Sequence, residues 1–209
     1  MRSYRQYAAG ARRPRAGGAN HRAARLPSGN AGRVDDHDWV TVVAGERCGQ
    51  CGLMASTLGT EELGGLFAGE GKAWARLLTG TDSAVLRRRR TPEVWSALEY
   101  GAHARDVLVV FTDRIGLTLS RDEPTFGWWD HEAAVVDERY NEQDPAAVAA
   151  AVEAAAVAMG ATLAAVEGPA WTRTGTRRDG ETFTVAGLAR FALHEVHHHR
   201  IDAEASVTA

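Results

Sequence analysis

Histidines gather near the C-terminal end of the chain, where residues 194–199 read HEVHHH. His194 and His198 are four residues apart, so on a helix their imidazoles lie one above the other and can point at a common atom. Leu188 and Phe191 share this face, which directs both imidazoles toward a protein interior where they need polar partners. The spacing therefore indicates part of a metal site.

His103 is a third candidate ligand, because it lies in the middle of another helical segment and Val107 continues its face inward. Three neutral imidazoles that leave a coordination position open suit Zn²⁺ first, and also Ni²⁺ or Fe²⁺. We predict a divalent metal site formed by His103, His194 and His198. The HxxxH spacing alone also occurs in helices that bind no metal, and we interpret His197 and His199 as residues on the surface or behind the ligands.

Charged residues lie close to these histidines in sequence. Asp106 and Asp202 follow His103 and His198 by about one turn, where a carboxylate can accept the outer imidazole N–H and fix the tautomer. A surface salt bridge is the simpler explanation for each. Arg105 is a candidate for binding an anionic substrate or cofactor, although it could equally face water.

Cys48 and Cys51 form a CxxC pair, and two thiols alone cannot complete a tetrahedral zinc site. The pair could be redox-active, could be half of a metal site completed by a histidine such as His37, or could be an inert turn. Further along, Trp128, Trp129 and Asp130 fall on a connection that could either line a pocket at the metal end or pack against it.

Four helices must position these residues. The first runs from about Thr60 to Leu78. The second begins at Thr91-Pro92-Glu93, an N-cap followed by proline and an acid, and continues to about Ser120. The third begins at Asp144-Pro145 and ends near Gly168, and its small residues permit close helix approach.

The fourth helix opens at Thr184 and runs through the histidine cluster to about Ala205. Long connections join the second helix to the third and the third to the fourth. A short hairpin is expected between Trp171 and Phe183, around Gly175, Asp179 and Gly180. The fold class is therefore all-α, a four-helix bundle.

A family resemblance adds to these observations. Residues 95–107, WSALEYGAHARDV, resemble the second helix of DinB-like proteins, and residues 193–198, LHEVHH, resemble the HxxxH of their last helix. The segments at 128–130, 138–140 and 183–185 resemble elements of an actinobacterial branch of that family, and the likeness covers roughly Asp38 to Asp202. The Cys48–Gly52 stretch departs from the general family pattern but is similar to a feature of that branch.

The resemblance implies a four-helix bundle with a three-histidine metal site. It also implies kinship with mycothiol-dependent maleylpyruvate isomerases. We therefore expect a metal-dependent transferase or isomerase that uses a low-molecular-weight thiol such as mycothiol as co-substrate. A metal-dependent hydrolase and a non-catalytic metal-binding stress-response module are the alternatives.

The charge of the chain is unevenly distributed. Residues 1–33 contain eight Arg and no acid, which leaves 16 basic and 27 acidic residues in the remainder. Residues 1–35, with hardly any large apolar side chains, are predicted to be a disordered basic arm ahead of a bundle domain at 36–205. The acidic remainder is not expected to bind nucleic acid.

The expected partners are a small-molecule substrate and a second copy of the chain in a homodimer. The N-terminus is Arg-rich but lacks an apolar signal segment, so a cytoplasmic location is expected. The stretch from Pro145 to Val166 has one charge, Glu153, and could be mistaken for a membrane span. Its alanine content and flanking acids favour a packed helix of a soluble protein, with no membrane partner.

Overall fold

A computed structural model describes residues 40 and 43–208 of the chain. Their elements are η2 (Ala55–Thr57), α2 (Thr60–Gly80), α3 (Ser83–Leu86), α4 (Ala97–Ser120), α5 (His131–Asp137), η3 (Tyr140–Glu142), α6 (Pro145–Ala164), η4 (Gly168–Thr172), β1 (Thr174–Thr176), β2 (Thr182–Thr184) and α7 (Val185–Val207). The helices α2, α4, α6 and α7 are long, and the remaining elements are short connections between them.

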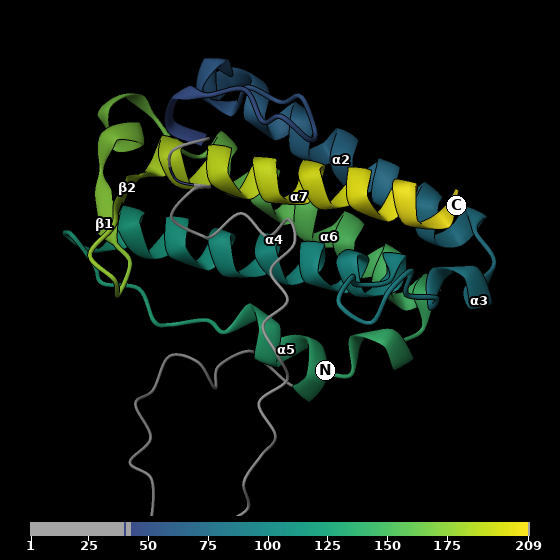
Figure 1. The fold of residues 1–209 in the computed structure, drawn as a ribbon. Helices are drawn as coiled ribbons and strands as arrows, with labels where there is room; N and C mark the ends of the chain where they lie inside the picture. The colour runs from purple at the N-terminus through teal and green to yellow at the C-terminus, as the bar shows by residue number, and fades with distance from the viewer. Residues whose placement is uncertain (1–39, 41–42, 209) are drawn as a thin grey trace, which may run out of the picture. The chain divides into compact units, whose positions relative to one another are not determined.

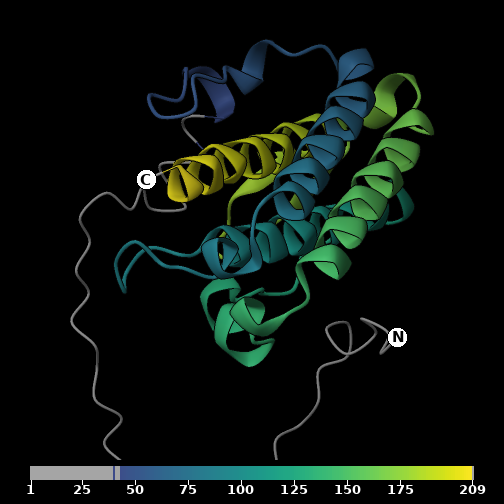
Figure 2. The same cartoon turned by 90° about the vertical axis from the view of Figure 1, so that its right-hand side faces the viewer.

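The four long helices form a bundle in which consecutive helices are not always neighbours (Figures 1 and 2). Both α2 and α4 pack against α6 and also against α7. The helices α2 and α4 therefore lie across the bundle from each other. This arrangement places α7 between α4 and α2, so that different faces of α7 meet each of them.

Polar side chains set the starts of the helices. Asp144 accepts a hydrogen bond from the Ala146 N–H ahead of Pro145, and Thr184 accepts one from the Gly187 N–H. Both caps confirm the starts predicted for the third and fourth helices. The predicted hairpin is also confirmed, since β1 and β2 pair antiparallel and Gly180 adopts a left-handed φ of 99° in their turn.

The start predicted for the second helix is wrong. The Thr91-Pro92 segment forms a turn, and α4 begins at Ala97. Ser96 accepts a hydrogen bond from the Glu99 N–H, and Glu99 accepts one from the Ser96 N–H, so this capping box satisfies the helix end better than the proline signal upstream. The start predicted for the first helix is confirmed, since α2 begins at Thr60, whereas α6 ends at Ala164 rather than near Gly168.

Small residues bring α2 and α6 into close contact. A Cβ added to Gly71 would lie 2.7 Å from the Cβ of Ala156, and Gly64 and Gly160 face each other through their backbones. By length and composition α6 could cross a membrane, and 39% of its apolar window is buried inside the bundle. The cytoplasmic location stays a prediction.

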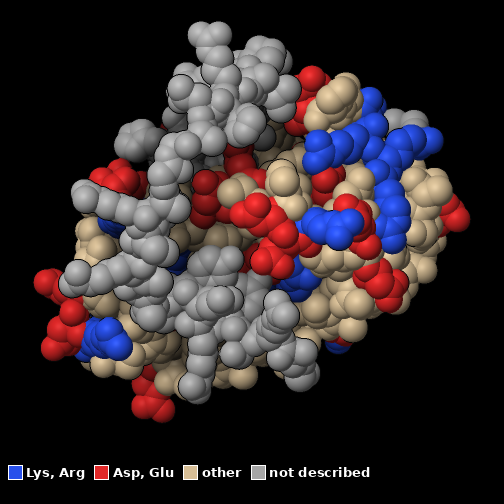
Figure 3. Space-filling model, turned by 90° about the horizontal axis from the view of Figure 1, so that it is seen from below, with Lys and Arg blue, Asp and Glu red and all other residues tan. Residues whose placement is uncertain are grey.

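The architecture confirms the predicted all-α four-helix bundle with long connections and one small hairpin. The predicted basic arm, residues 1–35, and His37 lie outside the described residues. On the face seen in Figure 3, acidic side chains gather beside a band of basic ones. The expected absence of a nucleic-acid partner stays a prediction.

Candidate functional site

One segment of α7, residues 194–200, presents polar side chains in three directions. His194 and His198 form one pair four residues apart, and Glu195 and His199 form a second pair displaced by one residue. Because one residue corresponds to about 100° of rotation on a helix, the two pairs face different neighbours. On a third face, His197 Nδ1 lies 2.8 Å from Glu70 Oε1, and Arg200 Nε donates to Glu70 Oε2 at 2.7 Å.

Glu195 and His199 face His103 of α4, and we call these three residues the α4–α7 cluster. One potential ligand atom from each lies within 4.8 Å of the other two. Glu195 Oε2 lies 3.8 Å from His103 Nε2 and 3.5 Å from His199 Nε2. The side chains are 3%, 12% and 16% exposed, in the order His103, Glu195, His199, so three ionisable groups converge in a largely dry place.

The protein environment sets the charge of each member. Burial lowers the pKa of His103 to about 4, which keeps this imidazole neutral at pH 7. Burial opposes ionisation of Glu195, but hydrogen bonds to His103 and His199 outweigh it and lower its pKa. Burial also opposes protonation of His199, but hydrogen bonds to Asp202 and Glu195 outweigh it and raise its pKa to about 9. At pH 7 the ionised Glu195 is therefore paired with a protonated, positively charged His199.

The cluster fits a divalent metal ion. The buried Glu195 Oε1 and His103 Nδ1 have no hydrogen-bond partner among the described residues. His199 Nδ1 lies 3.2 Å from Asp202 Oδ2, and its Nε2 faces Glu195, so a metal ion that displaces the Nε2 proton would find this nitrogen directed toward the carboxylate. Two imidazoles and one carboxylate are a common donor set for Zn²⁺ and for Fe²⁺.

Aromatic side chains surround the α4–α7 cluster. The Trp129 ring stacks on His103 with centroids 5.6 Å apart, and Trp95 lies 5.1 Å from the same imidazole. Tyr100 stacks on His199 at 5.2 Å. His131 lies 5.8 Å from His103 and belongs to α5, on the same connection as Trp129. These rings limit the access of water to the three donors.

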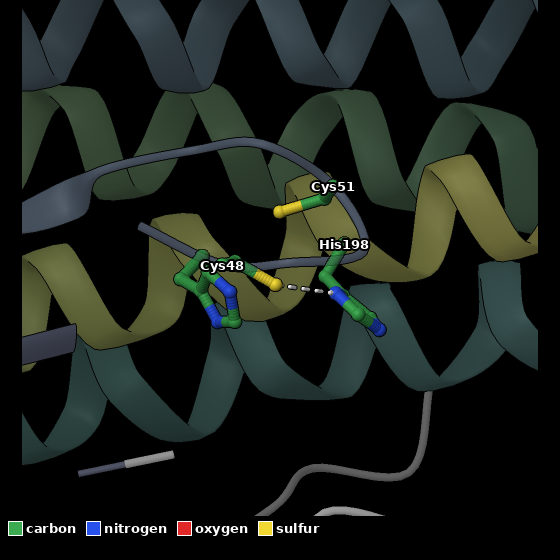
Figure 4. Close-up of side chains that lie close together, drawn as sticks. Cys48, Cys51 and His198 are labelled. Carbon is green, nitrogen blue, oxygen red and sulfur yellow. Dashed lines mark hydrogen bonds between the residues drawn. The ribbon is translucent and has the colours of Figure 1, made fainter. Parts of the chain in front are cut away.

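The other α7 pair, His194 and His198, faces the loop that carries Cys48 and Cys51, and we call these four residues the thiol cluster. Their potential ligand atoms lie within 4.8 Å of one another. Cys48 Sγ is 3.5 Å from His198 Nδ1, and Figure 4 shows this sulfur directed at the His198 ring. Burial lowers the pKa values of His194, to about 4, and of His198, and burial raises the pKa of Cys51 to about 11.

The structure does not gather the three predicted ligands in one place. His194 and His198 lie together in the thiol cluster, whereas His103 lies with Glu195 and His199 in the α4–α7 cluster. His199, interpreted from sequence as an outer residue, is a member of the latter. The signal that could have found it is the Glu195–His199 spacing, which repeats that of His194 and His198 one residue later.

The remaining candidates have defined contacts. Asp202 contacts His198 and His199, as the one-turn spacing predicted for such a carboxylate. Asp106 instead accepts hydrogen bonds from Tyr140 Oη and from Arg105 Nε. Arg105 also donates to Gln143 Oε1 at 2.7 Å, and its role toward an anionic ligand stays a prediction. Asp130 caps α5 through the Ala133 N–H, and the adjacent Trp128 is 54% exposed.

Comparisons with known proteins agree with this architecture. The sequence profile of the DinB superfamily matches residues 67–203, which include all of α4 and α6 and most of α2 and α7. The fold is similar to that of YfiT from Bacillus subtilis, a structure described as a probable metal-dependent hydrolase with an unusual four-helix bundle topology. The TM-score is 0.65 at 16% identity, over 70% of this chain and 85% of that one. No curated protein matches the chain in sequence. Since the profile spans most of the bundle, the chain belongs to the DinB superfamily.

Proposed function

We propose that the chain is a metal-dependent enzyme whose divalent ion is held by His103, Glu195 and His199. The observation that carries this proposal is the convergence of three donors from α4 and α7 within 4.8 Å in a largely buried place. When bound, such an ion lowers the pKa of a coordinated water or thiol and so supplies a nucleophile near neutral pH. Three protein donors leave a coordination position for that nucleophile, as catalytic metal sites do.

The surrounding residues have separate tasks in this proposal. Through the 3.2 Å contact with Nδ1, Asp202 keeps the remaining proton of His199 on Nδ1 when the metal displaces the proton on Nε2. Burial keeps His103 neutral, so its imidazole does not need to lose a proton at pH 7. Trp95 and Trp129 exclude water from one side of His103 and present apolar surface to a substrate.

The nucleophile that we propose first is a low-molecular-weight thiol of the mycothiol type, as the resemblance to mycothiol-dependent enzymes implies. The reaction is then a transfer or isomerisation that proceeds through the thiolate, and the protein belongs to the actinobacterial branch. Zn²⁺ is the metal that we expect, with Ni²⁺ and Fe²⁺ as alternatives.

Hydrolysis is the second candidate. Two histidines and one glutamate are the donor set of zinc peptidases, in which a bound water attacks a carbonyl. The similarity to YfiT, described as a probable metal-dependent hydrolase, also favours this reaction. Both candidates use the same three donors and differ in the nucleophile.

Calorimetry on the metal-loaded chain separates the two candidates. Mycothiol, bacillithiol and glutathione would be titrated up to millimolar concentration into the wild type, His103→Ala and His197→Ala. We expect thiol binding that His103→Ala abolishes and that His197→Ala, which changes the Glu70 face, retains. Absence of thiol binding together with His103-dependent hydrolysis of an activated ester would replace the thiol reaction by the hydrolase. Absence of both activities would favour a metal-binding module without turnover.

A further inference from the structure

The thiol cluster is separate from the proposed catalytic site and has its own complete set of donors. Cys48 and Cys51 contribute two sulfurs from a loop before α2, and His194 and His198 contribute two imidazoles from α7. Both cysteines are free thiols, and Cys48 is only 5% exposed. Two thiols and two imidazoles form a ligand set that selects zinc over the harder metals magnesium and calcium.

The distances in the cluster suit one tetrahedral ion. Bonds of about 2.3 Å to sulfur and 2.0 to 2.1 Å to nitrogen give a tetrahedron with edges of about 3.3 to 3.8 Å. Cys48 Sγ and His198 Nδ1 are 3.5 Å apart, and all four donor atoms lie within 4.8 Å of one another. A bound ion needs only small side-chain rotations to contact all four.

The local sequence explains how the loop presents both sulfurs. Gly52 N–H donates to the Cys48 carbonyl at 2.9 Å, and Cys48 N–H donates to the Leu53 carbonyl at 2.8 Å, so the backbone closes a tight turn around the pair. Gly52 has a φ of 76°, a left-handed conformation that glycine adopts without strain. Figure 4 shows this loop passing over α7, with Cys51 and Cys48 on the side of His198.

A redox pair explains the cysteines less well. A reversible disulfide between Cys48 and Cys51 needs only those two residues, and it gives no reason for two imidazoles to be buried beside them. His194 and His198 are 1% and 3% exposed, and buried imidazoles of this kind require polar partners. A metal ion uses all four side chains at once.

Asp202 connects the thiol cluster to the α4–α7 cluster. Its Oδ2 lies 3.4 Å from His198 Nε2 and 3.2 Å from His199 Nδ1. Because His198 turns Nδ1 toward Cys48, a metal held at Nδ1 would leave the proton on Nε2, which faces the Asp202 carboxylate. The same carboxylate therefore orients one imidazole of each cluster.

We propose that Cys48, Cys51, His194 and His198 bind a second ion, Zn²⁺, in a closed four-ligand site that fastens the loop before α2 to α7. With four protein ligands and no position for substrate, this site is structural. It lies beyond the proposed catalytic function and does not depend on it, since the two clusters share no ligand.

The metal content of the full chain tests this inference, because Cys48 and Cys51 are its only cysteines. We expect two Zn²⁺ per chain in the wild type and about one in Cys48→Ser/Cys51→Ser and in His103→Ala. Zinc-edge absorption spectra of the His103→Ala protein should show sulfur at about 2.3 Å, and those of the double serine variant should not. His197→Ala is the matched control and should keep both ions.

A measurement on the wild type alone covers the case in which the double serine variant fails to fold. A thiol-specific mercurial added to the zinc-loaded chain should release one equivalent of Zn²⁺ as it titrates the two thiols. Release of no zinc, or a zinc spectrum without sulfur in the wild type, would overturn the second site. Either result would leave the proposed catalytic site untouched, since His103, Glu195 and His199 contain no sulfur.

Discussion

Two neighbouring faces of α7 both carry side chains that can bind a metal, but the two clusters that they form differ in composition. The α4–α7 cluster collects three donors from two long helices of the bundle and is surrounded by aromatic rings. The thiol cluster collects four donors, two of them from a short loop outside the bundle. Ligand number distinguishes the two chemically, because an ion with three protein ligands can accept a substrate and an ion with four cannot.

The difference also lies in what each cluster supports mechanically. His103 and its partners lie on helices that already pack against each other, so their geometry is set by the core. Cys48 and Cys51 lie on a loop that contacts α7 through His198 and whose sulfurs lie within 4.8 Å of donor atoms of both histidines. We infer that loss of the first cluster removes activity without unfolding the chain, whereas loss of the second lowers stability.

The largest effect is expected from the α4–α7 cluster. Replacing His103 or His199 by alanine removes one of three ligands, so metal affinity at that site should fall by more than the ~10–100-fold that loss of an outer partner costs. Activity should fall with it. Metal analysis and activity assays on the two variants measure the two quantities. Retained activity in both variants would contradict the assignment.

Loss of the thiol cluster should affect stability most. A metal present at about a thousandfold above its dissociation constant stabilises the folded state by about 4 kcal/mol. Cys48→Ser/Cys51→Ser should therefore lower the unfolding temperature by about 8 °C or more. Scanning calorimetry with and without a chelator measures this effect. If the serine variant and the wild type unfold at the same temperature in excess zinc, the structural role is wrong.

Part of this comparison could be predicted from the sequence and part could not. Asp144-Pro145 and Thr184 mark helix starts because a capping side chain acts within three residues. His103 and His194 were identified as buried by helical periodicity alone. The pairing of His103 with Glu195 and His199, however, depends on the rotation of α7 about its axis relative to α4. Side chains one residue apart on a helix point about 100° apart, so a small rotation changes which residues of α7 face His103.

Helical periodicity could not predict the thiol cluster, for another reason. Cys48 and His198 are 150 residues apart and meet only after the bundle has formed. The sequence offered a CxxC pair and an HxxxH pair, which together supply the four donors of a zinc site with two cysteines and two histidines but lie far apart in the chain. The family resemblance directed both histidines to His103 instead. A local loop and a helix face can be recognised separately without showing that they meet.

Asp202 should link the two faces, with a smaller effect on each. Asp202→Ala removes the acceptor that orients His198 and His199, so the affinity of both sites for Zn²⁺ should fall by about 10–100-fold. Titration with competing chelators in the single-site backgrounds Cys48→Ser/Cys51→Ser and His103→Ala measures each site separately. Glu204→Ala, which changes a carboxylate on the same helix that pairs with Arg200, is the control. An effect confined to one site would show that Asp202 does not connect them.

The third face of α7 provides the smallest expected effect and a baseline for the other two. Burial opposes ionisation of Glu70, but hydrogen bonds from His197 and Arg200 outweigh it and lower its pKa below 4.5. Such a carboxylate stabilises the folded state above pH 4.5, and this contribution disappears as the pH falls through the lower folded-state pKa. Glu70→Gln should therefore cost about 1–2 kcal/mol at pH 7 and progressively less below pH 4.5. Both metal sites should keep their occupancy at pH 7, because the hydrogen-bond partners of Glu70 are His197 and Arg200, and neither is a ligand of either site. Urea unfolding of the two proteins between pH 3 and pH 7 measures the difference, and a difference that grows toward low pH would contradict the sign. A loss of zinc in Glu70→Gln would show that the three faces of α7 are not independent.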